Sequence, residues 1–173
     1  MGRLRIMSHN VWKNDKNLPA WVAKGEDCSA AVRATGMVRI YAETQPDIIG
    51  FQEMSPTMAD EILLGLTSQD QRYALLWGRD TPILYRQDRF ELLNSDFFLY
   101  STELPGWAGE FNNSGTKSWC IAVFRDKTDG KKLAFMSTHL WWKSSDPASP
   151  DYQPGSDEAR VYQLNLAMDR LEQ

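Results

Sequence analysis

Residues 45–54 read QPDIIGFQEM and predict a buried β-strand that ends on a carboxylate. Pro46 marks the end of any preceding helix, because the residue before a proline disfavours the helical conformation. The stretch 47–53 is apolar at its centre without alternation, as expected for a strand covered on both faces. The predicted strand therefore lies inside a layered α/β domain and holds Glu53 rigidly at the edge of a sheet.

Helical patterns flank this strand in the chain. Before it, apolar side chains recur at spacings of three and four, at Ala31, Ala34, Val38 and Tyr41. After it, Ser55 and Pro56 supply an N-cap and a first-turn proline. The inner face of that second helix is expected to hold Met58, Ile62, Leu63 and Leu66. A last helix is predicted from Ser156 onward, with an inner face of Val161, Leu164, Met168 and Leu171.

Further strands are expected at 4–10, 72–77, 82–86, 89–100, 119–125 and 132–139. Asp129 and Gly130 predict a hairpin turn between the last two. Residues 11–29 are expected to form a polar loop. Two long loops are expected at 101–118 and 143–156. Loops of this length are uncommon unless they have a role in binding or gating, although disorder is the alternative. The order of elements predicts an α/β domain with mixed sheets.

Composition excludes some classes of protein. The chain of 173 residues has 42% hydrophobic and 24% charged residues, which is typical of a single globular domain. The net charge of −4 and the lack of a Lys/Arg run disfavour tight, sequence-independent binding to DNA. A small or metal-bridged phosphate substrate fits better. Cys28 and Cys120 form no Cys-x-x-Cys pattern and are expected to remain two separate buried thiols.

Location in the cell follows from what the N-terminal region lacks. No apolar run approaches the length that spans a membrane. Arg3 and Arg5 interrupt any apolar core of a signal peptide. We therefore expect a cytoplasmic protein, or an exported one whose leader has been removed.

Three predicted strands end on polar side chains, namely Asn10, Glu53 and His139. One such ending means little, but three together predict strands that converge on one site. An ionised Glu53 suits a hard cation such as Mg²⁺, and the carbonyl oxygen of Asn10 can ligate it or hold a metal-bound water. His139 can donate a proton or a hydrogen bond to a phosphoryl oxygen. A metal with donors for developing charge is an arrangement for phosphoester cleavage.

Each of these residues also has a structural alternative. Asn10 could cap the turn into the following loop. Glu53 could be a charge that flanks the next helix. His139 could be a satisfied core or rim histidine. His9 faces opposite to Asn10 on an alternating strand and is interpreted as structural.

Weaker candidates for substrate binding lie near two other strand ends. Tyr85 and Arg86 end PILYR, where Arg86 could contact a phosphate, although a surface charge is the favoured interpretation. Trp141, Trp142 and Lys143 follow His139 and could line the mouth of a substrate site, where aromatic rings suit a base, a sugar or an acyl group equally well. Lys117 is compatible with a phosphate contact at the rim.

At this point the chain resembles the endonuclease/exonuclease/phosphatase superfamily. The resemblance rests on RIMSHNVW, QPDIIGFQEM, PILYRQDRFELL and FMSTHLWW, whose order and spacing cover almost the whole chain. Within the superfamily, the Trp-Trp-Lys after the histidine is similar to an uncharacterised bacterial group. The resemblance implies a four-layer, DNase I-like α/β sandwich with mixed sheets and hydrolysis of a phosphodiester or phosphomonoester with Mg²⁺, or Mn²⁺ in its place. It implies that Asn10 and Glu53 belong to the metal site and that His139 stabilises the phosphate.

The chain departs from the family in what is missing. Family members carry roughly a hundred further residues, on ordinary domain sizes, with a Gly-Asp-x-Asn strand end and a closing Ser-Asp-His. Neither motif occurs in this sequence. We therefore expect residues 1–173 to form a single but incomplete domain, truncated at its C-terminus. An incomplete sandwich exposes apolar faces and strand edges, which predicts marginal stability or self-association.

Two functions follow. The first is a metal-dependent phosphoesterase that is active in its complete form. The alternative is a catalytically inactive fragment or module that binds phosphate or metal but lacks the water-activating Asp and the final His. A plain nucleotide-binding domain is disfavoured, because no glycine-rich phosphate loop follows the first strand.

Overall fold

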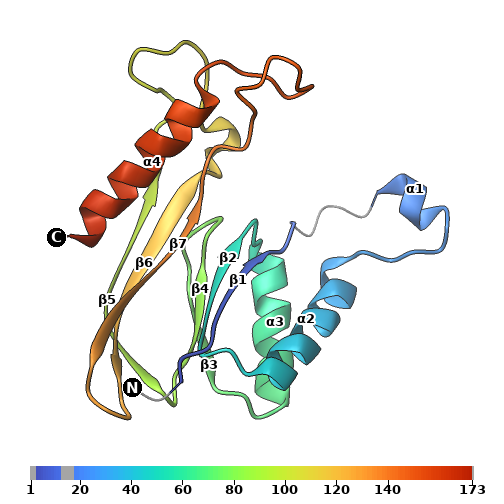
Figure 1. Ribbon diagram of the computed structural model, residues 1–173. Coiled ribbons are helices and arrows are strands. Elements are labelled where there is room, and N and C mark those ends of the chain that lie inside the picture. Colours follow the sequence, from blue (N-terminus) through green and yellow to red (C-terminus); the bar gives the residue numbers. More distant parts are fainter. Residues whose placement is uncertain (1–2, 13–17, 173) are drawn as a thin grey trace.

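Strand β2 (Ile48–Gln52) lies in the interior of a four-stranded sheet, as its apolar sequence predicts. The computed structural model describes residues 3–12 and 18–172 (Figure 1). The strand order in this first sheet is β1 (Ile6–Asn10), β2, β4 (Ile83–Arg86) and β3 (Tyr73–Leu76). Strands β1 and β2 are parallel and the other pairs are antiparallel, so the sheet is mixed.

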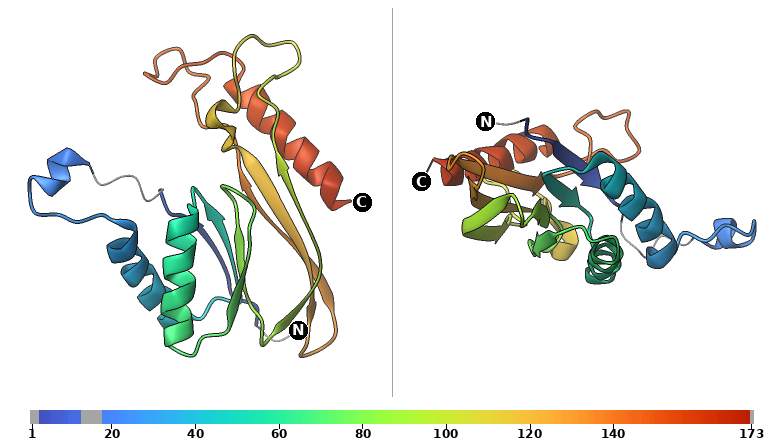
Figure 2. Two further views of the ribbon diagram at one scale, coloured as in Figure 1. Left: turned by 180° about the vertical axis from the view of Figure 1, so that it is seen from behind. Right: turned by 90° about the horizontal axis from the view of Figure 1, so that it is seen from below.

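A second sheet packs face to face on the first. It is antiparallel, in the order β5 (Phe90–Leu99), β6 (Ser118–Asp126) and β7 (Lys132–His139). Helices α2 (Ala30–Thr44) and α3 (Pro56–Ser68) cover the outer face of the first sheet, and α4 (Ser156–Leu171) covers the second. Figure 2 shows α4 and the α2/α3 pair on opposite sides of the sheets. The result is the predicted four-layer α/β sandwich.

Gly50 of β2 lies directly against β7 of the second sheet. A Cβ atom at this position would lie 3.1 Å from side-chain atoms of Phe135 and Ser137 on β7. A larger residue would therefore force Phe135 or Ser137 to shift by a few tenths of an ångström. On the other face of β2, the fully buried Ile49 and Phe51 pack with α2 and α3, so both faces of the strand are covered.

An ion network joins the two sheets at the end opposite His139. The guanidinium of Arg89 donates to Asp47 at 2.6 Å and to Asp126 at 2.9 Å, and both carboxylates are buried. Burial alone would raise the pKa of Asp126, but hydrogen bonds from Thr128 and the Arg89 guanidinium outweigh burial and lower this pKa to about 2. The network satisfies charges that would otherwise be costly to bury.

The predicted inner face of the last helix is wrong for three of its four residues, and only Leu171 packs against the core. Val161, Leu164 and Met168 are 60%, 44% and 46% exposed, whereas Ala159, Gln163 and Ala167 are buried. Small alanines allow α4 to lie close to its neighbours: Ala167 packs in a cluster with Trp119 and Ile121 of the second sheet, and Ala159 packs in a cluster with Phe111 and Trp141 of the loops. Gln163 is buried because its amide accepts from the Trp141 backbone N–H at 2.8 Å and donates to the Phe111 carbonyl at 3.1 Å. A need for hydrogen bonds therefore decides which face points inward.

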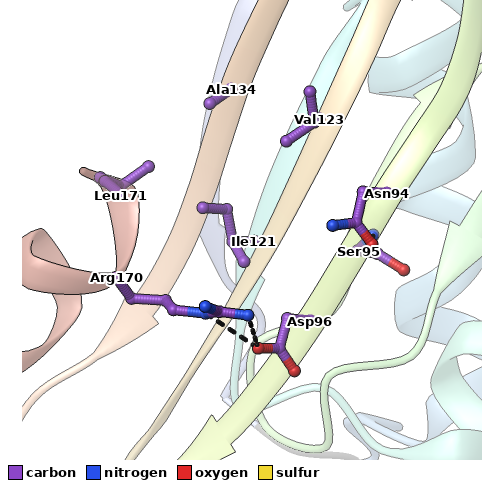
Figure 3. A pocket seen from close by; sticks show the side chains of 8 residues that line it. All are labelled: Asn94, Ser95, Asp96, Ile121, Val123, Ala134, Arg170 and Leu171. Atoms are coloured by element: carbon purple, nitrogen blue, oxygen red, sulfur yellow. Dashed lines mark hydrogen bonds and ion pairs between the residues drawn. The ribbon is translucent and has the colours of Figure 1, made fainter. Parts of the chain in front are cut away.

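The C-terminal turn of α4 is anchored to β5 by an ion pair. Arg170 donates to one oxygen of Asp96 at 2.9 and 3.1 Å, and Figure 3 shows this pair beside a cavity of about 200 Å³. Both side chains are partly exposed, so the pair adds little stability. Ile121 of β6 lines the cavity. It lies three residues along the strand from Ser118, which pairs with His139 of β7. The cavity is therefore separate from the predicted site.

Most predicted boundaries differ from the observed ones by only one or two residues. The predicted 11–29 loop contains a short helix, α1 (Pro19–Val22), and its residues 13–17 lie outside the described residues. Loop 101–118 contains the 3₁₀ turn η1 (Asn113–Gly115). Cys28 and Cys120 form no disulfide. Among the described residues, no helix is both long enough and apolar enough to cross a membrane.

Candidate functional site

His139 ends β7 at the edge where the second sheet approaches Glu53 of the first sheet, which we call the mouth, and it is held by a buried carboxylate. Its Nδ1 atom lies 2.6 Å from Oδ2 of Asp80, which is 3% exposed. Asp80 lies in the turn before β4, directly after Arg79, whose φ of 54° is in the left-handed region. The aspartate therefore fixes the orientation of the imidazole ring, since Nδ1 is committed to it.

Lys117 contacts the other nitrogen of the same ring. Its Nζ atom lies 2.8 Å from Nε2 of His139, and the residue is only 4% exposed. Asn112 positions this lysine, because its side chain accepts from the Lys117 N–H at 2.8 Å and donates to the Lys117 carbonyl at 3.0 Å. The sequence predicted Lys117 as a rim contact, whereas the structure buries it against the histidine.

These two contacts assign the proton on the ring. An ionised carboxylate only accepts hydrogen bonds, and an ammonium only donates them. Nδ1 of His139 therefore carries the hydrogen given to Asp80, and Nε2 accepts from Lys117. The three residues form a continuous chain of charge-assisted hydrogen bonds across the second sheet and the turn before β4.

Glu53 approaches this chain from the first sheet. Its Oε1 atom lies 3.9 Å from Nε2 of His139. Parallel pairing aligns Asn10 with Gln52 at the carboxyl ends of β1 and β2, so Asn10 reaches the next residue, Glu53, and donates to Oε1 at 3.0 Å. Glu53 has a φ of 61°, a strained conformation for a residue with a side chain. The convergence of Asn10, Glu53 and His139 is thus observed.

The alternative for Asn10 is also observed. Its side-chain oxygen accepts from the backbone N–H of Trp12 at 2.9 Å, which caps the turn after β1. The same side chain therefore fixes the chain direction and contacts Glu53. Behind these residues, Ser137 of β7 donates to the Phe51 carbonyl at 2.7 Å and ties the two sheets together.

Tyr85 and Arg86 are not brought to this site. Strand β4 runs antiparallel to β2, with Tyr85 opposite Ile48, so both residues lie at the other end of the sheet from Glu53. The ring of Tyr85 packs on Phe124 inside the core. Arg86 pairs with Asp88 and Asp47. The surface-charge interpretation of Arg86 is therefore the one that the geometry supports.

Trp141, Trp142 and Lys143 lie just beyond His139 but differ in their surroundings. Trp141 is buried against Phe111, whereas Trp142 is 50% exposed. The ammonium of Lys143 lies 5.8 Å and 6.0 Å from the centres of the two indole rings. These residues form a wall that continues from the end of β7 into the loop above it.

His9 takes no part in the cluster. Its Nδ1 atom lies 2.6 Å from the hydroxyl of Tyr41 on α2, on the helix-covered face of the first sheet. Burial, with a smaller effect of the Arg33 charge, lowers the pKa of His9. This placement agrees with the structural interpretation from the sequence.

The oxygen donors of the cluster fit part of a divalent-metal site. Within the described residues, no group of three or more His, Cys, Asp and Glu side chains is placed to hold a metal. The side-chain nitrogen of Asn10 faces the Glu53 carboxylate, and its side-chain oxygen, which accepts from the Trp12 N–H, would have to leave that bond to join Glu53 as a ligand. Such a pair suits Mg²⁺, which proteins commonly hold through one or two carboxylates while water and substrate phosphate complete the shell.

Asp80 is the functional candidate that sequence reasoning missed. It is 59 residues from His139 in the chain, and no local motif connects the two. The available signal was its position, a lone carboxylate directly before the Thr81-Pro82 entry to an apolar strand. A buried charge at such a position needs a partner, and His139 is one.

Comparison with solved structures identifies the fold. The mannosyl-6-phosphatase Bt3783 of Bacteroides thetaiotaomicron superposes with a TM-score of 0.69 at 19% identity, over 98% of this chain and 59% of its own. A Bacteroides vulgatus endonuclease/exonuclease/phosphatase superposes at 0.67 with 18% identity, over 96% and 59%. D. rerio TDP2, solved with a single-strand DNA product, superposes at 0.64 with 20% identity, over 100% and 56%.

The chain therefore has the fold of endonuclease/exonuclease/phosphatase proteins, as its sequence motifs predict. It spans between 56% and 59% of the length of these three structures. No family model and no curated protein matches the sequence.

Proposed function

We propose that this chain, with its endonuclease/exonuclease/phosphatase fold, carries the phosphate-binding part of a metal-dependent phosphoesterase site. One observation carries the proposal. The chain of hydrogen bonds from Asp80 through His139 to Lys117 faces the carboxylate of Glu53 across the mouth between the sheets. An ammonium at 2.8 Å and a carboxylate at 3.9 Å from the same histidine nitrogen suit a phosphate and a bridging cation better than they suit a structural core.

Each residue has a distinct role in the proposed site. The Lys117 ammonium donates to a phosphoryl oxygen that takes the place of its contact with His139. Asp80 keeps Nε2 of His139 directed at the same oxygen, and once Nε2 no longer accepts from Lys117 it can take up a proton and donate a hydrogen bond to that oxygen. Glu53 and Asn10 would hold Mg²⁺, or Mn²⁺, through their side-chain oxygens. Such an ion, when bound, polarises a phosphoryl oxygen and neutralises charge that develops on it.

The substrate class is a phosphate ester of an alcohol. One structural neighbour is named as a mannosyl-6-phosphatase and another was solved with a DNA product, so both monoesters and diesters are compatible with the fold. The net charge of −4 supports a small substrate rather than duplex DNA.

The test is hydrolysis of bis-p-nitrophenyl phosphate and p-nitrophenyl phosphate by the purified chain with Mg²⁺ or Mn²⁺. We expect turnover that requires the cation and is abolished in Glu53→Gln and His139→Gln. Glu91→Gln is the matched control, because Glu91 of β5 forms an exposed pair with Arg125 of β6. Turnover that persists in Glu53→Gln would refute the assignment.

The alternative is a module that binds phosphate and cation without turnover. It is favoured by the described residues, among which no group of three or more His, Cys, Asp and Glu side chains is placed to hold a metal. It predicts binding of orthophosphate, lost in Lys117→Met, with no hydrolysis of either ester. Hydrolysis that appears when a complementary polypeptide is added would support the phosphoesterase for the complete protein.

A further inference from the structure

Asn10 binds two neighbours at the mouth with the two ends of one amide group. Its side-chain nitrogen donates to Oε1 of Glu53 at 3.0 Å, and its side-chain oxygen accepts from the backbone N–H of Trp12 at 2.9 Å. Oε1 of Glu53 in turn lies 3.9 Å from Nε2 of His139. The amide of Asn10 therefore connects the proposed site to the turn that follows β1.

The two hydrogen bonds fix the direction of this amide. A carboxylate only accepts hydrogen bonds and a backbone N–H only donates them, so the amide directs its nitrogen to Glu53 and its oxygen to Trp12. A half-turn of the amide would place an oxygen against the carboxylate and an N–H against the Trp12 N–H. Both contacts would be repulsive, so the observed direction is strongly preferred.

The preference reverses when Glu53 holds a divalent cation. Mg²⁺ takes oxygen ligands, so the oxygen of Asn10 is then favoured beside Glu53 and its nitrogen is not. The half-turn that brings this oxygen to the cation also brings an N–H of Asn10 to the N–H of Trp12. Two donors cannot share that contact. The backbone of Trp12 must therefore move when Asn10 becomes a ligand.

Trp12 has a strained backbone that this contact helps to hold. Its φ of 51° lies in the left-handed region, which a residue with a side chain adopts only at a cost. On its other side, the guanidinium of Arg33 on α2 donates to the carbonyl of Val11 and, at 3.3 Å, to that of Trp12. Loss of the bond to Asn10 removes one of the contacts that keep Trp12 in this conformation.

The ring of Trp12 makes such a movement observable. It is 43% exposed and lies against the ring of Trp21 in α1, with ring centres 5.4 Å apart and planes inclined by 57°. A change in the backbone of Trp12 therefore changes the distance and angle between the two indoles.

We propose that the turn at Trp12 is a switch operated by a divalent cation. When Asn10 turns its oxygen to a cation on Glu53, the N–H of Trp12 is released and the Trp12 ring moves relative to Trp21. The inference rests on the proposed function, because it takes Asn10 and Glu53 as ligands of the cation.

Arg33 is the positioning residue of this switch. It stabilises the arrangement in which Trp12 bonds to Asn10, and that arrangement competes with cation binding. A ligand shifts an equilibrium between two states by its difference in affinity for them. A weaker hold on Trp12 should therefore raise the affinity for the cation.

The experiment is titration of the full chain with Mg²⁺ alone, followed by calorimetry and by far-ultraviolet circular dichroism. Two indole rings this close give an exciton couplet, and we expect the couplet of Trp12 and Trp21 to change in step with Mg²⁺ binding. Trp21→Phe should abolish this change and keep the affinity for Mg²⁺. Trp142→Phe is the matched control and should keep the change, because Trp141 and Trp142 form a second indole pair with centres 6.1 Å apart.

Arg33→Met tests the positioning role. We expect Mg²⁺ to bind at least about threefold more tightly to this variant, because it loses hydrogen bonds that favour the competing arrangement. Arg39→Met, at an exposed position of the same helix, is the control and should bind Mg²⁺ as the wild type does. An affinity of Arg33→Met that is unchanged or lower would overturn the role of Arg33, since a merely structural residue gives one of these results.

The outcomes separate the switch from the proposed function. Mg²⁺ binding that Glu53→Gln abolishes, without any change in the couplet, overturns the switch and leaves the proposed metal site intact. A change in the couplet that survives in Glu53→Gln also overturns the switch, because the change then does not come from a cation at this site. If Mg²⁺ does not bind at all, the proposed metal site and the switch both fail.

Discussion

The Nζ atom of Lys117 lies 2.8 Å from Nε2 of His139, and both residues stand at the same end of adjacent strands in the second sheet. Antiparallel pairing places Ser118, the first residue of β6, opposite His139, the last residue of β7. The lysine just before β6 therefore reaches the histidine across the ladder. Lys117 is only 4% exposed, so water screens its ammonium charge little and the group is a strong donor to an anion at the mouth.

Replacement of Lys117 by Met should weaken orthophosphate binding by about tenfold or more, the value of one charge-assisted hydrogen bond. The side chain is similar in length, so the packing around His139 is largely kept. Isothermal titration measures the affinity, and circular dichroism checks the fold. Lys132→Met, at the exposed start of β7, is the control and should bind as the wild type does. Equal affinities for the two variants would remove Lys117 from the site.

Asp80→Asn should release the orientation of His139. The wild-type ring carries its hydrogen on Nδ1, because the Asp80 carboxylate accepts it at 2.6 Å. An asparagine can offer an N–H instead, so the population of the Nε2–H tautomer should rise. The chain has only two histidines, so ¹⁵N NMR of the imidazole nitrogens resolves both. An unchanged His139 spectrum in the variant, with a changed His9 spectrum, would contradict this role.

The sequence best predicted those features of the fold and the site whose signals lie in neighbouring residues. The buried strand at β2 and the N-cap at Ser55, which accepts from the Met58 N–H at 3.2 Å, follow from neighbouring residues and were predicted. The convergence of Asn10, Glu53 and His139 was predicted because polar residues follow three strand patterns. Asp80 was missed because its partner His139 is 59 residues away in the chain and no sequence motif includes both residues.

The face of α4 was predicted wrongly for a different reason. Periodicity identifies an apolar stripe but not the surface that the helix packs against. Here the second sheet accepts the alanines of α4, and two backbone groups in the loops require Gln163. The apolar stripe of Val161, Leu164 and Met168 therefore points outward.

This exposed stripe of α4 should promote self-association. Apolar residues spaced by three and four on an uncovered helix face gain free energy when they are buried. Sedimentation velocity of the wild type should show a larger species that grows with concentration. The double variant Leu164→Glu with Met168→Glu should be monomeric, and Asn165→Glu, on an exposed position of the same helix, should resemble the wild type. A monomeric wild type at every concentration would contradict the expectation.

Asp126 predicts a loss of stability in acid. Its pKa in the folded chain is about 2, below its ordinary value of 3.8, because hydrogen bonds from Thr128 and Arg89 outweigh its burial. The ionised group therefore stabilises the fold above about pH 4, and this contribution is lost as the pH falls from about 4 to about 2. Urea denaturation of the wild type and of Asp126→Asn should give a difference in unfolding free energy that shrinks over this range. A difference that does not change with pH would refute the assignment.

The most direct test of the central claim is titration of orthophosphate with and without Mg²⁺, in the wild type and in Glu53→Gln. If Glu53 and Asn10 hold a cation beside Lys117 and His139, Mg²⁺ should tighten phosphate binding by about tenfold in the wild type, a coupling within the usual range. In Glu53→Gln this coupling should vanish, whereas Glu91→Gln should keep it. A joint metal and phosphate site at this mouth would be contradicted if the phosphate affinity of the wild type did not depend on Mg²⁺. It would also be contradicted if Glu53→Gln kept the coupling between Mg²⁺ and phosphate.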